Sequence, residues 1–145
     1  MEIEIIKLNN SMPLPSFQTE GAAAIDLHSS NHVDIKSKTT GMVFTGVMLH
    51  IKDPNVCGIV APRSGIATKY KVSLANTIGV IDSDYQGEII LHLENKGCNL
   101  LEIERGQRIA QMMFIPILKP EFKEVLEFSE NTARGSGGFG HTGSR

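Results

Sequence analysis

The sequence predicts an all-β domain, a jelly-roll-like sandwich or barrel of many short strands with one short helix. Three observations carry this prediction. Apolar residues alternate with polar or small ones in several segments, turn residues separate these segments, and a single stretch has helical spacing instead. The length of 145 residues and the apolar content of 41% fit one domain with its own core.

Alternation is clearest in residues 43–51, 89–94 and 109–117, which we expect to be strands. In the last of these, period-two spacing places Ile109, Gln111 and Met113 on one face. Turn residues at 53–55, 95–97 and 104–106 separate the strands. Shorter strands are expected at Glu2–Lys7, Val33–Lys36, Cys57–Ala61, Leu100–Ile103 and Phe122–Leu126.

Two segments depart from the strand pattern. Residues Ser64–Tyr70 have helical spacing and predict one or two helical turns. Residues 131–145 hold five glycines and almost no apolar side chains, so they do not bury enough surface to order themselves. We therefore expect a β domain over residues 1–130, followed by a flexible Gly-rich C-terminal arm over residues 131–145.

Charge and cysteine usage narrow the class of protein. The net charge is −2, with 14 basic and 16 acidic residues, which argues against a nucleic-acid partner. Cys57 and Cys98 lack Cys-x-x-Cys spacing and are expected to be free thiols in a reducing compartment. No apolar run reaches the length of a membrane span, and the first ten residues lack the order of a signal peptide. We expect a cytoplasmic protein without a membrane partner.

The most informative stretch is residues 79–88, where an apolar run leads into two acids. Asp82 and Asp84 are separated by one small residue and followed by Tyr85 and Gly87. Turn residues at these positions predict the tip of a β-hairpin that follows a buried strand. An ordinary polar hairpin tip is the better interpretation of this segment taken alone.

Three further segments offer anion-binding or carboxylate chemistry. Arg63 and Ser64 stand where a strand gives way to the short helix, and free N–H groups at a helix start suit phosphate. A Ser N-cap beside a surface Arg is the simpler interpretation there. Gln111 needs hydrogen-bond partners, either backbone or a ligand, and the sequence leaves this open. For Asp26, between apolar residues, we favour a carboxylate that caps nearby backbone N–H groups.

The C-terminal segment 134–143 combines glycines with an Arg and a Phe. Glycines let backbone N–H groups converge on an anion, and Arg134 adds a bidentate phosphate donor. Ser136 and Thr142 add hydroxyls, and the ring of Phe139 is able to lie flat on a base. A flexible linker is the simpler alternative. The segment is not a P-loop, because the Gly-Lys-Ser/Thr ending is missing.

Together with Ala23-Ala24-Ile25-Asp26-Leu27, these segments resemble, in this order, the five motifs of the trimeric deoxyuridine triphosphatases (dUTPases). The resemblance runs from Ala22 to Gly143, and Pro62–Ala67, Ile78–Glu88 and Arg134–Gly143 are its specific stretches. It implies a β jelly-roll homotrimer with three active sites at subunit interfaces. Such an enzyme hydrolyses dUTP to dUMP and pyrophosphate with Mg²⁺ on the triphosphate, which limits uracil in DNA and supplies dUMP for dTMP synthesis.

The resemblance also implies a role for each candidate residue. Asp82 would orient and activate the attacking water, and Asp84 is less suited because a one-residue shift turns its side chain away. Tyr85 would pack under the deoxyribose. Asp26 would act on neighbouring groups without touching substrate. The uracil edge would be read by Asn76, Gly79 and Ile81, and the phosphates held by Arg63, Ser64, Gly65 and Gln111.

The resemblance further implies that the Gly-rich arm closes over the site of another subunit. Phe139 would cover the base. Mg²⁺ would bind phosphate oxygens and waters, with no direct protein ligand. The arm residues expected at the phosphates are Arg134, Ser136, Gly137, Gly140 and Thr142.

Two alternatives remain at this stage. A dCTP deaminase shares the fold and the phosphate-binding logic, but it lacks this combination of acidic segment and Gly-Phe-Gly tail. A nucleotide-sensing regulatory binder would use the same pocket without turnover. Intact Asp82, Arg63 and Arg134 speak against an inactive enzyme.

Overall fold

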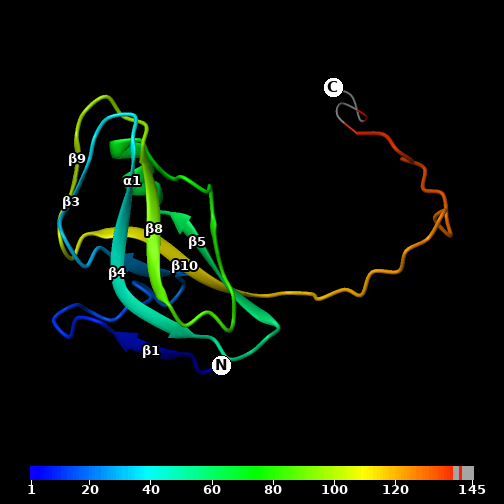
Figure 1. Cartoon of the computed structure of the whole chain (residues 1–145), viewed down its shortest axis with the longest axis horizontal. Helices are drawn as coiled ribbons and strands as arrows, with labels where there is room; N and C mark the ends of the chain where they lie inside the picture. Colours follow the sequence, from blue (N-terminus) through cyan, green and yellow to red (C-terminus); the bar gives the residue numbers. More distant parts are fainter. Residues whose placement is uncertain (139–140, 142–145) are drawn as a thin grey trace.

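Two four-stranded antiparallel sheets pack against each other in the computed structural model, which describes residues 1–138 and 141 (Figure 1). One sheet has the strand order β1-β4-β8-β6 and the other β2-β10-β5-β7, while β3 and β9 form a separate pair. The elements are β1 (Glu4–Lys7), β2 (Ile25–His28), β3 (Val33–Ile35), β4 (Thr40–His50), β5 (Val56–Pro62), α1 (Ser64–Tyr70), β6 (Val72–Leu74), β7 (Gly79–Ile81), β8 (Glu88–Asn95), β9 (Leu101–Ile103) and β10 (Arg108–Pro116).

The core lies between the two sheets and follows the period-two alternation. In β4 and β8, Val43, Val47 and Leu91 are almost fully buried, and they face Leu27 and Met112 of the other sheet. Full burial of one such side chain stabilises the fold by about 1.5–3 kcal/mol. The alternation predicted for residues 43–51 and 89–94, and the helix over Ser64–Tyr70, are confirmed.

Strand β10 contains a bulge that the sequence pattern did not predict. Its register with β2 shifts between Arg108 and Ala110, so that one extra residue, Ile109, stands in β10. Ile109 therefore points into the core at 1% exposure, whereas Gln111 and Met113 line the outer face. The expected shared face of Ile109 and Gln111 was wrong, because a bulge reverses the alternation on one side of it.

The expected hairpin at residues 79–88 was also wrong in its pairing. β7 pairs with β5 in one sheet, whereas β8 pairs with β4 and β6 in the other. Residues 82–87 therefore cross from one sheet to the other. β7 is an edge strand, and Val80 in it is 58% exposed.

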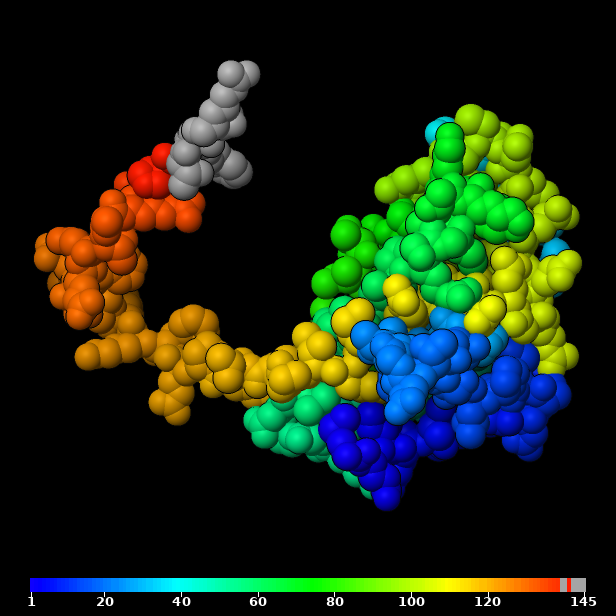
Figure 2. Space-filling model, turned by 180° about the vertical axis from the view of Figure 1, so that it is seen from behind, coloured from blue at the N-terminus to red at the C-terminus, as the bar shows by residue number. Residues whose placement is uncertain are grey.

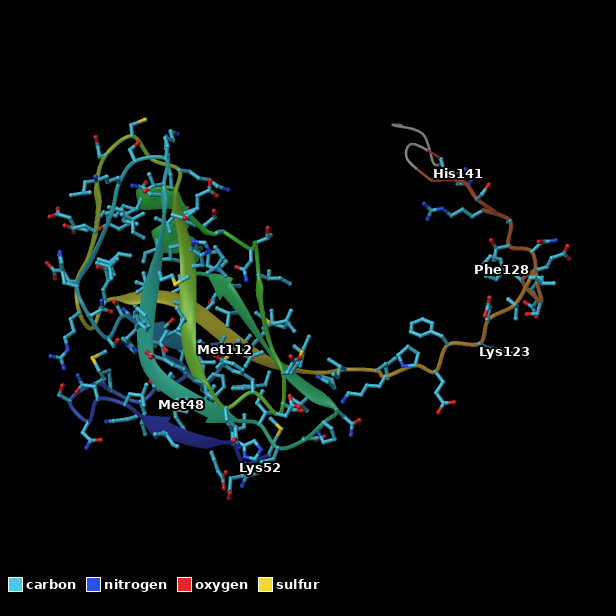
Figure 3. The ribbon with its side chains drawn as sticks, viewed as in Figure 1. Met48, Lys52, Met112, Lys123, Phe128 and His141 are labelled. Carbon is cyan, nitrogen blue, oxygen red and sulfur yellow. The ribbon has the colours of Figure 1, made fainter. Side chains whose placement is uncertain are left out.

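Beyond β10 the described residues leave the sandwich as an extended arm, residues 118–130, and as the first part of a tail, residues 131–138 (Figures 1 and 3). Figure 3 shows Lys123 and Phe128 well away from the body. The strand expected at Phe122–Leu126 was wrong: within the described residues this segment is not assigned to any strand. A strand needs a ladder partner, and this segment, which runs away from its own sheets, has none in the part of the chain that the structure describes.

Among the described residues, no helix is long and apolar enough to cross a membrane.

Candidate active site

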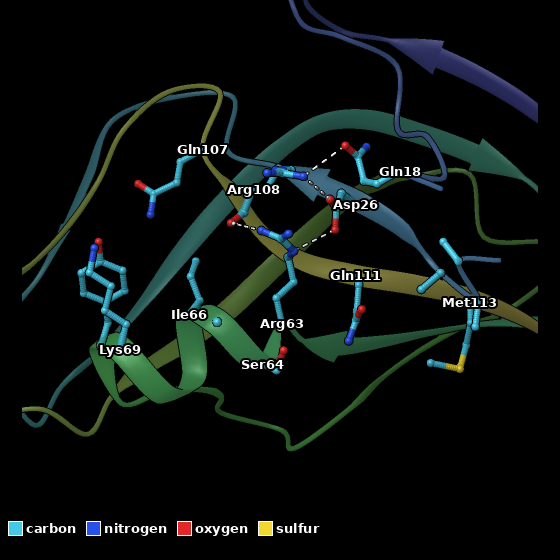
Figure 4. A pocket seen from close by; sticks show the side chains of 15 residues that line it. Gln18, Asp26, Arg63, Ser64, Ile66, Lys69, Gln107, Arg108, Gln111 and Met113 are labelled. Carbon is cyan, nitrogen blue, oxygen red and sulfur yellow. Dashed lines mark hydrogen bonds and ion pairs between the residues drawn. The ribbon is translucent and has the colours of Figure 1, made fainter. Parts of the chain in front are cut away.

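A cleft of about 780 Å³ opens where three distant segments meet (Figures 2 and 4). The segments are residues 18–26, helix α1 and strand β10. In Figure 2 their blue, green and yellow atoms adjoin on one face of the body. Five residues that the sequence pointed to line this cleft: Asp26, Arg63, Ser64, Gly65 and Gln111.

Asp26 is the electrostatic centre of the cleft. Its side chain is 8% exposed, and Oδ1 forms an ion pair with Nε of Arg63 at 2.8 Å, while Oδ2 accepts a hydrogen bond from Nη1 of Arg108 at 3.1 Å. Arg63 also donates weakly from Nη1 to the Arg108 carbonyl, at 3.4 Å. Because a buried carboxylate requires partners, two cations satisfy it. The expected role of Asp26 as a cap for backbone N–H groups was wrong.

The start of helix α1 supplies uncharged donors. Arg63 has extended backbone at the N-cap position without a side-chain cap bond, so Ser64 is the first helical residue rather than a cap. A Cβ added at Gly65 meets nothing within 4 Å, so this position offers backbone in open space. Gln111, whose partners the sequence left open, donates from Nε2 to the Pro62 carbonyl at 3.1 Å. This bond holds its amide at the cleft.

Sequence reasoning missed several polar residues of the lining: Gln18, Lys69, Tyr70, Gln107 and Arg108. For Lys69 a signal existed, since helical spacing places it one turn after Gly65 and Ile66 on the same side. For Arg108 the sequence pattern was misleading, because regular alternation predicts that Arg108 and Gln111 lie on opposite faces of the strand. The bulge at Ile109 brings both to the same face.

Charge gives the cleft its chemical character. Its lining holds three cationic side chains, Arg63, Lys69 and Arg108, and one carboxylate, Asp26, so its net charge is +2. Arg guanidinium, amide N–H and hydroxyl groups directed at one space are the donors that phosphate oxygens accept. The arrangement is suited to hold a polyphosphate.

His28 lies beside this cluster at the end of β2, opposite Arg108 in the ladder. Its half-burial lowers the pKa of the imidazole below 6.5; the Asp26 charge opposes this shift, and the Arg108 and Arg63 charges add to it. Between the folded-state pKa and 6.5 the unfolded chain therefore binds more protons than the folded one.

The free energy of unfolding should consequently fall as pH decreases below about 6.5 through the folded-state pKa of His28. In His28→Gln this contribution is removed, so denaturant titrations between pH 7 and pH 5 should show a shallower loss of stability. His92→Gln, which removes an exposed histidine from the other sheet, controls for the loss of an imidazole. Equal pH slopes for wild type and His28→Gln would contradict the expected linkage.

The acidic residues predicted to act on water lie elsewhere in the chain. Asp82 and Asp84 are exposed on the connection between β7 and β8, where they line a second cleft of about 510 Å³ with His50, Lys52 and Lys119. The N–H of Tyr85 donates to the Asp82 carbonyl at 3.2 Å and closes a tight turn. Among the described residues, none lines both clefts.

Tyr85 is fixed against this turn. Its hydroxyl donates to the Glu88 carbonyl at 2.9 Å, and its ring lies directly over Gly87, where an added Cβ would come within 2.6 Å of Cζ. Gly87 is therefore needed for the position of the ring. At 42% exposure the ring keeps one face toward solvent.

The remaining candidates of this region lie on the approach to the turn. Asn76 is exposed in the β6–β7 connection, where its carbonyl accepts from the Ile78 N–H at 2.7 Å. Gly79 and Ile81 belong to β7. A Cβ at Gly79 would approach the Val60 Cβ to 3.2 Å, so close packing of β7 on β5 favours glycine there.

Of the tail candidates, the described residues Arg134, Ser136 and Gly137 line neither cleft. In the described part of the tail, Arg134 donates from Nε to the Gly137 carbonyl at 2.9 Å, and the Gly137 N–H donates to the Arg134 carbonyl at 3.1 Å. Ser136 lies inside this small turn. Three expected residues, Phe139, Gly140 and Thr142, lie outside the described residues.

Comparisons with known proteins show the family of the chain. The dUTPase family model matches residues 10–143. Deoxyuridine 5'-triphosphate nucleotidohydrolases of Acinetobacter baumannii and Citrobacter koseri are each 42% identical over 141 residues, which are 96% of this chain and 93% and 92% of those proteins.

Solved structures share the fold. The dUTPase of Staphylococcus bacteriophage 80alpha with dUPNHPP has a TM-score of 0.90 at 25% identity, and the match covers 98% of both chains. A dUTPase variant from phage phi11 of S. aureus, whose structure concerns the coordination of a structural Mg(II) ion, has a TM-score of 0.83 at 20% identity over 90% of this chain and 100% of that one. With the family model matched over most of its length, the chain belongs to the dUTPase family.

Proposed function

We propose that this protein is a dUTP diphosphatase, which hydrolyses dUTP to dUMP and pyrophosphate. The observation that carries the proposal is the cleft that gathers Arg63, Ser64, Gly65 and Gln111 around buried Asp26. The 42% identical relatives are named for this activity. In the cell the reaction would limit uracil in DNA and supply dUMP for dTMP synthesis, with a small nucleotide rather than nucleic acid as partner.

The cleft fits a triphosphate that carries Mg²⁺. Both Asp26 oxygens already contact cations, Oδ1 in an ion pair with Arg63 and Oδ2 in a hydrogen bond from Arg108, so this carboxylate is committed to the cations rather than to a metal. Mg²⁺ usually keeps several waters and binds substrate phosphates, where it would neutralise charge on the leaving pyrophosphate. Arg63, the Ser64 hydroxyl, the Gly65 N–H and Gln111 would hold the phosphate oxygens and fix the α-phosphorus for attack.

Asp82 is the proposed general base. Its carboxylate would accept a proton from a water whose oxygen forms a bond to the α-phosphorus, while the bond from that phosphorus to the bridging oxygen of pyrophosphate breaks. Asn76 and the backbone at Gly79 and Ile81 would read the uracil edge. Hydrogen-bond donors and acceptors at fixed positions reject a mismatched base strongly, because its polar groups remain unpaired.

The proposed site is shared between subunits. Asp82 lines one cleft of the chain, whereas the cation cluster, Arg63 and Arg108 around Asp26, lines another. A second copy is therefore required to bring Asp82 to the phosphates held by Arg63. The tail residues Arg134, Ser136 and Gly137 stand away from both clefts and would arrive from a further subunit, together with Phe139, Gly140 and Thr142. Three copies then contribute to each site.

Apolar surface supports this assembly. On the outer face of the second sheet, Met113 pairs with Ile59, and Ile59 pairs with the exposed Val80. The arm adds side chains without cover in their own chain, including Phe122 at 96% and Leu126 at 104% exposure. Contiguous exposed apolar surface of this kind marks an interaction site.

The protein should accordingly be a homotrimer in solution. Light scattering coupled to size exclusion measures its mass, and three times the 15.8 kDa of one chain is the expected result. Introducing a charge on the outer sheet face, as in Met113→Glu, should lower this mass and the activity together. A monomer mass in a fully active sample would exclude the shared site.

Replacing Tyr85 by Ala should weaken discrimination between dUTP and UTP. The ring is fixed by its bond to the Glu88 carbonyl and by Gly87, so it presents a rigid face under the sugar. The kcat/KM ratio of dUTP to UTP measures the effect, with Tyr85→Phe as the control that keeps the ring. An unchanged ratio in folded Tyr85→Ala would give the ring a purely structural role.

The activity itself is tested by pyrophosphate release with Mg²⁺ from dUTP, dTTP, dCTP and UTP. We expect turnover of dUTP alone. Ammonia release from dCTP would identify a deaminase, and tight nucleotide binding without turnover would identify a regulatory binder. We further propose a cytoplasmic location, where exposed thiols such as Cys98 persist in the free form that the structure shows.

A further inference from the structure

The cation cluster of the cleft extends beyond the pair of Asp26 and Arg63. Arg108 donates from Nη1 to Asp26 Oδ2 at 3.1 Å and also to Gln18 Oε1 at 3.1 Å. Gln18 in turn is fixed by its amide, whose Nε2 donates to the carbonyl and hydroxyl of Ser16 at 3.3 and 3.2 Å. Figure 4 shows this chain of contacts from Gln18 through Arg108 and Asp26 to Arg63.

The same loop is tied to the strand that carries the carboxylate. The Asp26 N–H donates to the Ser16 carbonyl at 3.2 Å, so the loop that carries Ser16 and Gln18 is bound to β2 by backbone as well as through the Arg108 side chain. The bulge at Ile109 supplies the last link, because it turns Arg108 to the face of β10 that carries Gln111. A regular strand would place Arg108 on the opposite face.

This arrangement determines how Arg63 meets a ligand. Its Nε forms an ion pair with Asp26 and its Nη1 donates to the Arg108 carbonyl, so among the described residues Nη2 remains for the cleft. Without Arg108, one oxygen of a carboxylate only 8% exposed would lose its cation, and the pair of Asp26 and Arg63 would carry no net charge. With Arg108, the three side chains of Asp26, Arg63 and Arg108 together carry a charge of +1.

We propose that Arg108 and Gln18 are positioning residues for phosphate binding. Gln18 holds the Arg108 guanidinium against Asp26, and Arg108 in turn fixes the carboxylate that orients Arg63. The proposal rests on the proposed function, since it assigns the residues that prepare the same cleft for a triphosphate.

The first experiment compares two arginines by calorimetric binding of inorganic tripolyphosphate and by dUTP turnover. Arg108→Gln should weaken tripolyphosphate binding and raise the KM for dUTP about 10- to 100-fold, as expected for the loss of a charge-assisted contact, with a smaller effect on kcat. Arg105→Gln is the matched control: Arg105 lies on the preceding loop, lines a neighbouring cleft and bonds to Ser11. If both substitutions weaken tripolyphosphate binding equally, Arg108 contributes only its positive charge and not a specific position. That result would overturn the proposal.

The second experiment tests the order of the contacts with a double-mutant cycle. Gln18→Ala should weaken tripolyphosphate binding about 2- to 10-fold in the wild-type background, as for one hydrogen bond, and have no further effect in Arg108→Gln. Equal effects in both backgrounds would mean that Gln18 does not act through Arg108. If Arg108→Gln does not fold, Arg108→Lys serves instead, because its single ammonium keeps the charge but loses the planar fork.

The two proposals fail differently. If the wild type neither binds tripolyphosphate nor hydrolyses dUTP, the proposed function is wrong and the positioning role with it. If the wild type does both and Arg108→Gln behaves like Arg105→Gln, only the positioning role is wrong.

Discussion

Asp82→Asn should bind a non-hydrolysable dUTP analogue with wild-type affinity but lose turnover by about 10²–10⁴-fold, the usual contribution of a positioned general base. The amide keeps the shape of the carboxylate and loses its ability to accept a proton from water. The exposed turn that carries Asp82 tolerates this change, because its closing bond joins the Asp82 carbonyl to the Tyr85 N–H and uses no carboxylate oxygen. Single-turnover pyrophosphate release measures the effect.

Asp84→Asn is the matched control for this experiment, since it makes the same change two residues along the same turn. It should retain most of the turnover. If instead Asp82→Asn is nearly as active as wild type while Asp84→Asn is not, the role of the base belongs to Asp84.

Removal of residues 134–145 should abolish most activity while leaving the fold and the trimer intact. The described tail residues form their hydrogen bonds among themselves, as between Arg134 and Gly137, so the core loses no partner. The melting temperature should barely change. Turnover should fall because the closed complex loses a guanidinium, hydroxyls and backbone N–H donors around the phosphates. A control that removes only residues 144–145 should keep its activity.

A shared site allows a sharper version of this test. Subunits with Asp82→Asn and subunits without the tail are each expected to be inactive, but a mixed trimer forms sites that combine an intact Asp82 with an intact tail. Mixing should therefore restore part of the activity. If labelled subunits demonstrably exchange and activity stays at the level of the separate variants, the tail either serves its own subunit or takes no part in catalysis.

The sequence by itself determined those features that depend on local chemistry. Val43, Val47 and Leu91 are buried as their alternation predicts, because side chains of a strand point to opposite faces whatever the strand pairs with. Helix α1 likewise begins and ends where its residues predict, at Ser64 and Tyr70. The groups suited to phosphate were also recognisable as residue types in their short motifs.

Only the tertiary structure decided which groups meet. Arg108 reaches Asp26 because of a bulge at Ile109. A single extra residue in one strand produces no recognisable periodicity in the sequence, so the bulge was not predicted. Asp82 lies apart from Arg63 because β7 and β8 join different sheets, and pairing is a contact between residues distant in the chain. Phe122–Leu126 has the residues of a strand, but no described strand of the chain pairs with it. Local propensity determines which segments form helices and strands. The contacts that build a site depend instead on how strands distant in the sequence pair with one another.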